Sequence, residues 1–244
     1  MGNNLIAVGG SIGAGKTLTS MKIAKVLAEK KTNVILVLCD VVTPSLPLLL
    51  PSAADTKSLG DLLSLSTLNQ IHVYQHCVAA GGYLSLLGYQ LGETEISYPE
   101  YDKKRAKELL SLLQISADYV IIDCSSHVLS NILTGVALEA ADTVFKVINP
   151  DLKSAVHIQS QKTFFKEARF RYDKQINVMN NIYPEQDTAA YSECIGPVSY
   201  FLPHLPSLKE QYDSGKLNEN LIGRDAKKYE PVINRLVSEV ILYE

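Results

Sequence analysis

The sequence predicts an α/β fold in which a single, mostly parallel sheet is covered by helices on both faces. Short apolar runs rich in Val, Ile and Tyr alternate with longer helical stretches along the 244-residue chain. The runs are continuously apolar, which is typical of parallel strands buried on both faces. Because 46% of the residues are hydrophobic and no repeat, linker or low-complexity tract interrupts the alternation, we expect residues 1–244 to form one domain.

Each expected strand is a short apolar run, and most are followed by a helix or a turn. We place the strands at Leu5–Gly9, Asn33–Cys39, Ile71–Tyr74, Tyr119–Asp123, Thr143–Ile148, Ile176–Met179 and Val198–Leu202. The expected helices are Lys16–Glu29, Tyr101–Leu113, Val128–Ala140 and Leu152–Arg169. The stretch 71–97 is less regular and rich in Gly and Tyr. We interpret it as an excursion above the sheet that serves as a partner surface, and the alternative interpretation is an ordinary packed helix and loop.

Composition and charge favour a cytoplasmic protein. The chain has 23 Lys and Arg against 26 Asp and Glu, which argues against coating nucleic acid by charge alone. Residues 1–4 lack the basic start and apolar run of a signal peptide, and the lipidation cue at Gly2 is followed by Ile6 where Ser or Thr is required. No run of 18 apolar residues exists. The four cysteines form no close pairs, so we expect neither a metal framework nor disulfides.

The most specific signal is a complete phosphate-loop motif, G-x-x-x-x-G-K-[ST], after the first strand. Its glycines let successive N–H groups face a phosphate, and the helix that follows directs its positive end to the same anion. Lys16 is expected to reach the β- and γ-phosphates, and the Thr17 hydroxyl to ligate Mg²⁺. The residues that we assign to the nucleotide here are Gly10, Ser11, Gly13, Ala14, Gly15, Lys16, Thr17 and Leu18.

Two acidic residues each end a strand-like run. Asp40 follows the apolar run that ends at Cys39, and Asp123 ends Tyr119-Val120-Ile121-Ile122. The carboxyl edge of a parallel sheet is where ligands bind in such folds, and an apolar strand ending in Asp is the Walker B pattern. We therefore expect Asp40 and Asp123 to hold Mg²⁺ together with Thr17, and assign catalytic roles to Lys16, Asp40 and Asp123.

These features resemble the ParA/MinD-type P-loop ATPases of the SIMIBI class. The amino-terminal phosphate loop, Asp40 and "YVIIDCSS" match that pattern, and "ADTVFKVINPDLKSA" looks like the family's strand–Pro–helix unit. The resemblance covers nearly the whole chain. Within the family, the spacing of "PDLKS" and "LPHLP…GK" is closest to the CpaE/TadZ branch, which localises pilus-assembly machinery.

The resemblance also indicates which residues contact the base of the nucleotide, and which base it is. "INVMNNIYP" looks like the adenine-contacting segment, which places Asn180 on the base. "GPVSYFLPHLPSLKEQYDSGK" looks like the strand and loop that close over adenine, which adds Pro203 and Leu205. The Asn-Lys-x-Asp element of guanine-specific proteins does not occur, so the resemblance implies ATP.

Two departures from the family pattern bear on hydrolysis. The family carries a second lysine in the phosphate loop that reaches the partner's nucleotide in a sandwich dimer, and here that position is Ser11, followed by Ile12. The family's second strand ends in Asp-x-Asp, and here the second carboxylate is replaced by Val42. A cationic finger or water-positioning group is worth factors of about 10³–10⁵ in phosphoryl transfer. We therefore expect Mg-ATP binding with slow or partner-dependent hydrolysis, unless a residue such as Ser125 or Ser126 compensates.

The function that these observations favour is a Mg-ATP-binding switch that dimerises on nucleotide and positions or assembles a partner complex. We expect the partner to recruit it to a pole or a membrane-associated machine. A DNA-partition ATPase is one alternative, because a weakly basic segment lies between Lys153 and Lys174. A metabolic ATP-dependent synthetase on the same fold is the other. The amphipathic stretch 231–243 is expected to pack on the sheet, because its polar side carries Glu239 and Glu244 where a membrane helix would be basic.

Overall fold

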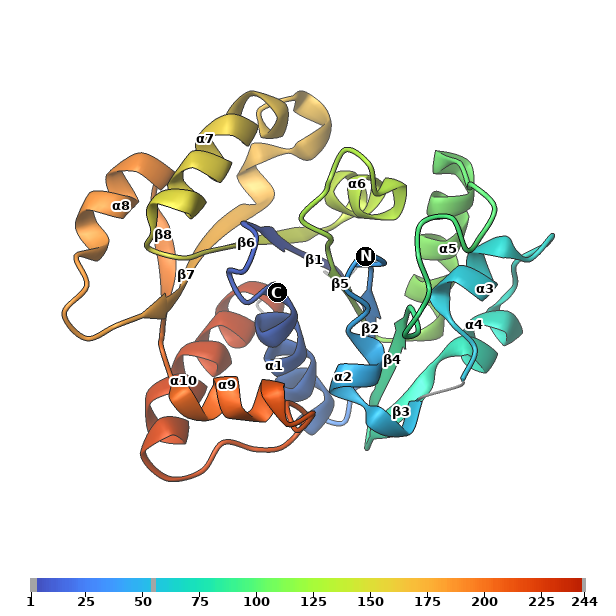
Figure 1. Ribbon diagram of the computed structural model, residues 1–244, viewed down its shortest axis with the longest axis horizontal. Coiled ribbons are helices and arrows are strands. Elements are labelled where there is room, and N and C mark those ends of the chain that lie inside the picture. Colours follow the sequence, from blue (N-terminus) through green and yellow to red (C-terminus); the bar gives the residue numbers. More distant parts are fainter. Residues whose placement is uncertain (1–3, 54–55, 243–244) are drawn as a thin grey trace.

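Eight strands form one sheet in the order β3-β4-β2-β5-β1-β6-β7-β8 (Figure 1). This computed structural model describes residues 4–53 and 56–242. All neighbouring strands are parallel except β3 and β4. The strands are β1 (Leu5–Gly10), β2 (Val34–Leu38), β3 (Val78–Gly81), β4 (Leu84–Gly88), β5 (Tyr119–Asp123), β6 (Thr143–Ile148), β7 (Gln175–Ile182) and β8 (Val198–Pro203).

Helices cover both faces of this sheet, as the sequence predicts (Figure 1). They are α1 (Lys16–Glu29), α2 (Leu46–Leu49), α3 (Leu59–Ser64), α4 (Gln70–His76), α5 (Lys103–Ser116), α6 (Ile132–Ala140), α7 (Leu152–Phe165), α8 (Thr188–Ile195), α9 (Pro206–Asp213) and α10 (Gly223–Leu236). A π-helical turn, η4 (Val237–Ile241), extends α10.

Alternation along β1 shows how one strand serves two cores. Ile6 and Val8 join the core beneath α1 and α10, whereas Leu5 and Ala7 join the core beneath α5 and α6. Successive side chains of a strand point to opposite faces, so a strand buried on both sides must be apolar throughout. The register aligns Val8 with Asp123 of β5, which brings the carboxyl end of β5 beside the end of β1.

One expected strand is wrong. Residues 71–74 belong to α4, whose first turn is capped by the Asn69 side chain accepting from the His72 N–H at 2.9 Å. Val73 and His76, three residues apart, are the buried positions of α4, which is helical spacing. The apolar run Ile71–Tyr74 therefore reflected one turn of helix, and its β-branched residues made it look like a strand.

The interpretation of residues 71–97 as an excursion above the sheet is also wrong in part. β4 pairs in parallel with β2, and β3 pairs antiparallel with β4 to form the edge of the sheet. The hairpin turns at Gly81 and Gly82, whose φ angles of 107° and 56° favour glycine. Gln90–Pro99 follows β4 as a loop, and Tyr98 of this loop packs against Gly60.

The carboxyl-terminal segment packs on the sheet. Ile233, Leu236 and Val237 are buried in the core that α10 shares with α1. Residues 1–3, on which the signal-peptide and lipidation arguments fall, and residues 243–244 lie outside the described part of the chain. Within 4–53 and 56–242, no helix combines the length and apolar character needed to span a bilayer.

Candidate functional site

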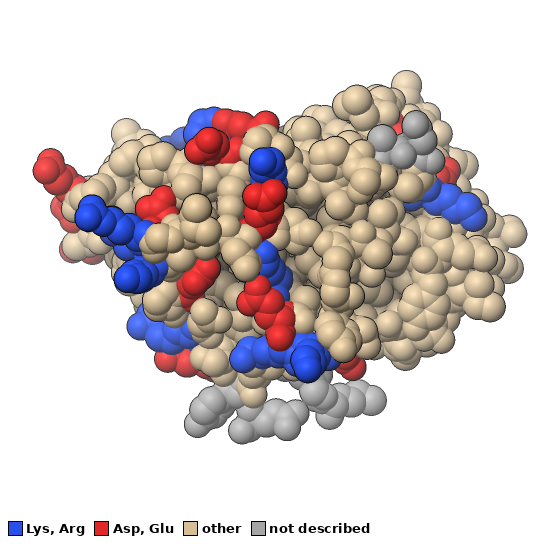
Figure 2. Space-filling view, turned by 90° about the horizontal axis from the view of Figure 1, so that it is seen from below, with Lys and Arg blue, Asp and Glu red and all other residues tan. Residues whose placement is uncertain are grey.

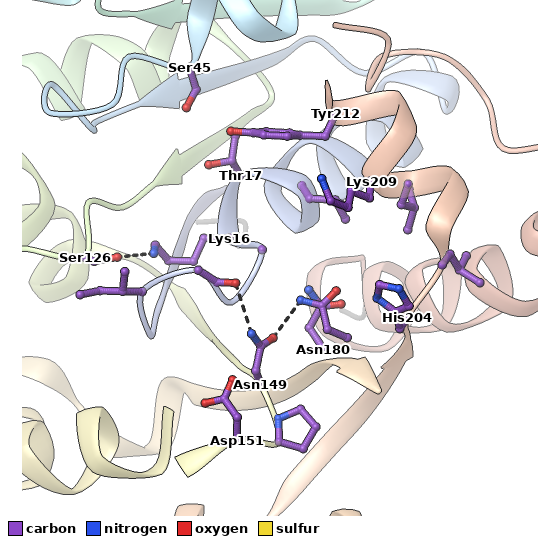
Figure 3. Close-up of a pocket in the computed structure, with 18 of the residues that line it drawn as sticks. Lys16, Thr17, Ser45, Ser126, Asn149, Asp151, Asn180, His204, Lys209 and Tyr212 are labelled. Carbon is purple, nitrogen blue, oxygen red and sulfur yellow. Dashed lines mark hydrogen bonds between the residues drawn. The ribbon is translucent and has the colours of Figure 1, made fainter. Parts of the chain in front are cut away.

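A pocket of about 730 Å³ opens at the carboxyl edge of the sheet, between the phosphate loop and α9 (Figure 3). Its walls come from the segments that follow β1, β2, β5, β6, β7 and β8. The carboxyl ends of parallel strands are where ligands bind in such folds. The lining residues are Ile12, Gly13, Gly15, Lys16, Thr17, Leu18, Asp40, Thr43, Ser45, Ser126, Asn149, Pro150, Asp151, Asn180, Asn181, Tyr183, Gln186, His204, Leu205, Leu208, Lys209 and Tyr212.

Two glycines are required by the path of the phosphate loop. Gly10 has φ 138°, and a Cβ there would lie 1.9 Å from the Val147 carbonyl oxygen. Gly15 has φ 85°, and a Cβ there would lie 2.4 Å from Nδ2 of Asn180. Any side chain at either position would be strained by its backbone angle and would displace the end of β6 or β7. The glycines therefore let the loop pass close to these strand ends.

Carbonyl groups on the outer side of the loop are held by two asparagine side chains. Nδ2 of Asn149 donates to the Gly13 oxygen at 3.2 Å, and Nδ2 of Asn180 donates to the Ala14 oxygen at 2.7 Å. The N–H groups of Lys16 and Thr17, in the first turn of α1, have no intrahelical acceptor. The loop therefore presents N–H groups and the positive end of a helix to the pocket, an arrangement that binds an anion.

Lys16 is a half-buried cation at the phosphate loop. Its Nζ donates to Ser126 Oγ at 2.5 Å and to the Ser11 oxygen at 3.3 Å. Burial lowers the pKa of Lys16, and the opposite charge of Asp123 works against that shift. A phosphate in the pocket would supply the counter-charge that these neutral partners lack.

Thr17 and Asp123 lie in direct contact. The Thr17 hydroxyl donates to Oδ2 of Asp123 at 2.6 Å, and the Ser20 hydroxyl donates to Oδ1 at 3.2 Å. Burial raises the pKa of Asp123 to about 6, because desolvation outweighs these hydrogen bonds and the attraction of Lys16. Asp123 lies behind Thr17 and does not line the pocket wall.

Asp40 lines the same pocket on the β2 side. Its Oδ1 accepts the N–H groups of Val42 and Thr43, each at 3.0 Å. The carboxylates of Asp40 and Asp123 with the Thr17 hydroxyl form a set of hard oxygen ligands, which fits Mg²⁺. Val42 is 62% exposed and supplies no carboxylate beside this set.

The far end of the pocket is built by the segments after β7 and β8. The rings of Tyr183 and His204 stack at 4.2 Å with an interplanar angle of 20°. Of the residues expected at the base, Leu205 and Asn180 line the pocket, whereas Pro203 lines an adjoining hollow of about 450 Å³. The aromatic pair and Leu205 offer a flat apolar surface suited to a planar ring.

Ser11 is fully buried, and its hydroxyl lies 2.7 Å from the Ser154 hydroxyl in the first turn of α7. Gly10, Ser11 and Ala14 belong to the phosphate loop without lining the pocket. Asn149, Gln186, His204 and Tyr212 also line the pocket, and no contact role was expected for them from the sequence. Asn149 directly follows a buried strand and precedes a proline, and this turn signal at the carboxyl end of a strand could have identified it as a site residue.

No family model and no curated protein matches the sequence. Solved structures match over nearly the whole chain. A ParA family ATPase from Chlorobium tepidum has a TM-score of 0.78 at 16% identity, covering 96% of this chain and 98% of its own. MinD from Pyrococcus horikoshii, complexed with Mg-ADP, has a TM-score of 0.75 at 18% identity, covering 96% and 95%. A Borrelia burgdorferi protein named for plasmid partition and bound to AMPPNP has a TM-score of 0.77 at 15% identity, covering 97% and 99%.

Proposed function

Because the chain has the fold of ParA and MinD ATPases, we propose that it is a nucleotide switch of that type, which binds Mg-ATP at the phosphate loop. The contact between Thr17 and Asp123 carries the proposal, because the two oxygen groups that it joins, next to Lys16 of the phosphate loop, are of the kind that Mg²⁺ prefers. Two structures of this fold hold Mg-ADP and AMPPNP, which supports the same ligand class here.

Each residue has a distinct task in this proposal. The loop N–H groups and Lys16 bind and orient the phosphates. Thr17, Asp40 and Asp123 would hold Mg²⁺, which when bound supplies charge neutralisation to the phosphate oxygens. Asn180 keeps Ala14 in place, and the stack of Tyr183 and His204 with Leu205 receives the base. We propose adenine as that base, on the resemblance of this segment to the adenine-contacting segment of the family.

Hydrolysis is proposed to be slow without a partner. Ser11 is a buried neutral hydroxyl bonded to Ser154, so it supplies no cation to a second molecule. Val42 stands where a second carboxylate would orient water. Groups of these two kinds contribute factors of about 10³–10⁵ in phosphoryl transfer. Single-turnover hydrolysis by the purified protein tests this part: a rate in the range of ordinary kinases, about 1–100 s⁻¹, would contradict it.

The nucleotide face is proposed to join two copies when Mg-ATP is bound. Exposed apolar side chains follow the carboxyl ends of four neighbouring strands of the sheet, the edge at which the pocket opens. They are Ile12 (46% exposed), Val42 (62%), Leu129 (81%) and Leu152 (76%). Large apolar side chains gathered around a ligand site are typical of an interaction surface. A γ-phosphate can order the loops that carry Val42 and Leu129, which would make the contact dependent on nucleotide.

The oligomeric state tests this step directly. Light scattering after size exclusion should report a monomer without nucleotide and a dimer with Mg-AMPPNP. Leu129→Glu should abolish the shift in mass, because it buries a charge in the interface. Ile115→Glu is the matched control, since Ile115 is also exposed but lies at the end of α5, on the opposite edge of the sheet. An unchanged monomer in saturating Mg-AMPPNP would remove dimerisation from the proposal.

We propose that a protein partner recognises the nucleotide-bound form. This partner would belong to a machine that the protein positions or assembles, as in the CpaE/TadZ branch. On the face formed around α9 and α10, basic and acidic side chains interleave (Figure 2). Such a surface is not the basic face that anionic lipid attracts. We therefore place the readout at protein contacts around the pocket mouth, within the cytoplasm.

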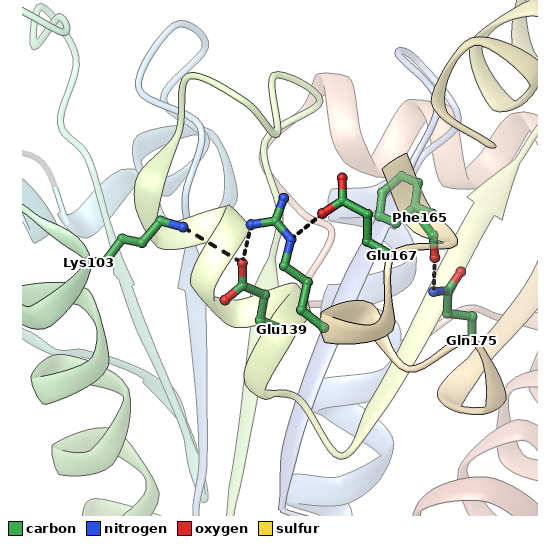
Figure 4. Close-up of polar contacts among 6 residues, drawn as sticks. Lys103, Glu139, Phe165, Glu167 and Gln175 are labelled. Carbon is green, nitrogen blue, oxygen red and sulfur yellow. Dashed lines mark hydrogen bonds and ion pairs between the residues drawn. The ribbon is translucent and has the colours of Figure 1, made fainter. Parts of the chain in front are cut away.

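Non-specific DNA is less well supported, because the two arginines of the basic segment form ion pairs with acidic residues. Arg169 contacts Glu139 and Glu167, each at 2.8 Å, and Lys103 approaches Glu139 at 3.9 Å (Figure 4). Arg171 lies 3.6 Å from Asp173. On α7, Lys153 and Lys162 are nine residues apart and so lie on opposite sides of the helix. The segment therefore does not form one continuous basic stripe.

A further inference from the structure

The segment from β6 into α7 holds the phosphate loop at three points. The Ser11 N–H donates to the Val147 oxygen at 3.1 Å. Nδ2 of Asn149 donates to the Gly13 oxygen at 3.2 Å. The third contact is the buried pair of Ser11 and Ser154 hydroxyls, 2.7 Å apart. Of the three, only the last joins the loop to α7 itself.

Ser154 lies at a junction of three segments. It is 1% exposed, and its N–H donates to Oδ1 of Asp151, the residue that caps α7, at 2.7 Å. Its Oγ also accepts the N–H of Asn149 at 3.3 Å. One hydroxyl therefore connects the start of α7, the end of β6 and the phosphate loop. A buried hydroxyl in such a network has no water to replace a lost partner.

Polar contacts rather than apolar burial fix the first turns of α7. Only Ser154, Ile158 and Phe165 are buried along its fourteen residues. Leu152 and Val156, on either side of Ser154, are 76% and 65% exposed. A helix end with few buried apolar contacts opens at low cost, so its protection depends on the hydrogen bonds that remain.

From this geometry we propose that Ser154 is a positioning residue that transmits occupancy of the phosphate loop to the first turns of α7. The inference rests on the proposed binding of Mg-ATP in this pocket. A bound phosphate fixes the loop N–H groups and with them Ser11, whose hydroxyl then holds Ser154 and the start of α7. Ser11, which stands where the resembled family carries a lysine, therefore contacts α7 of its own chain.

Hydrogen exchange of the whole protein, with and without saturating Mg-AMPPNP, tests the inference. In the wild type, nucleotide should slow exchange both in α1 and in residues 152–158. Ser154→Ala should keep the protection of α1 but lose about fivefold of the nucleotide-dependent protection of 152–158, the factor that corresponds to one neutral hydrogen bond. Ser160→Ala, an exposed serine of the same helix, should behave as the wild type.

A second pair of variants guards against a simple folding defect. Ser11→Ala should also reduce the nucleotide-dependent protection of 152–158, because it breaks the same contact between the Ser11 and Ser154 hydroxyls. Ser154→Ala also removes the acceptor of the Asn149 N–H, so the double variant should lose no more than Ser154→Ala alone. Equal protection of 152–158 in Ser154→Ala and wild type overturns the inference, as does a wild type that protects α1 but leaves α7 unchanged. A wild type that binds no Mg-AMPPNP overturns the proposed function, and the inference with it.

Discussion

The Thr17 hydroxyl donates a 2.6 Å hydrogen bond to Oδ2 of Asp123, which joins the start of α1 to the end of β5. Burial of Asp123 raises its pKa to about 6, so the ionised form of its carboxyl group is destabilised near neutral pH. A divalent cation at this point would relieve that cost. The ionisation of Asp123 therefore links the stability of the protein to pH and to metal binding.

Stability should fall as pH rises through the pKa of Asp123. A carboxyl whose pKa is raised on folding binds more protons in the folded state, so the free energy of unfolding decreases between about pH 4 and 6. The full effect of a shift of this size is about 3 kcal/mol. Urea unfolding at pH 4 and pH 7 should show Asp123→Asn gaining stability relative to the wild type at the higher pH. A constant difference across that range would contradict the burial argument.

Mg-ATP should bind more weakly as Asp123 becomes protonated. Only the carboxylate is a magnesium ligand, so affinity should drop below about pH 6, the value to which burial raises its pKa. Calorimetric titration from pH 5 to 8 measures this. Asp123→Asn should bind weakly at every pH, and an identical pH profile in that variant would show that another group is responsible.

Asn180→Ala should weaken nucleotide binding without disturbing the sheet elsewhere. It leaves the Ala14 oxygen without the donor that lies at 2.7 Å, a loss of about 1–3 kcal/mol, or roughly five- to 150-fold in affinity if it acts wholly on the loop. Asn177→Ala is the matched control, since Asn177 lies on the same strand and donates to the Pro197 oxygen. Equal affinities in the two variants would show that the loop does not depend on Asn180.

Ser11→Lys should not create a fast ATPase. Ser11 is fully buried and bonded to Ser154, so a lysine there must either bury a charge or displace the loop. We expect lower thermal stability and no gain in single-turnover rate beyond about tenfold, well short of what a positioned cation supplies. A gain of about 10³-fold would mean that the loop can turn this position outward and that α7 does not hold it.

Arg169→Ala should destabilise the fold by about 1–2 kcal/mol, because it removes the ion pairs with Glu139 and Glu167, of which only Glu139 keeps a second cation, Lys103. It also removes packing on Phe164 and Phe170. Lys162→Ala, exposed on α7, should change stability by less than about 0.5 kcal/mol. Neither variant should alter retention on non-specific DNA at 0.15 M salt. A clear loss of DNA retention in both would revive the partition alternative.

The sequence predicted the elements around the phosphate loop better than the edge of the sheet. β1, β5 and β6 follow from apolar runs bounded by Gly, Asp or Pro, and α1 follows from the phosphate-loop motif at its start. β3 and β4 were missed because β4 reads as Leu and Gly rather than Val and Ile, and the run before them is helical. Local patterns could not show that Ser11 faces α7 or that Tyr183 meets His204, since both contacts join residues far apart in sequence.

The most direct test of the central claim is calorimetric titration of the purified protein with Mg-ATP. We expect one binding site per chain. Lys16→Ala should lower the affinity about 100-fold or more, because it removes the charge-assisted contacts to the phosphates, and Lys162→Ala should leave the affinity unchanged. A wild type that gives no binding at millimolar Mg-ATP, or a Lys16→Ala variant that binds as tightly as the wild type, would contradict it.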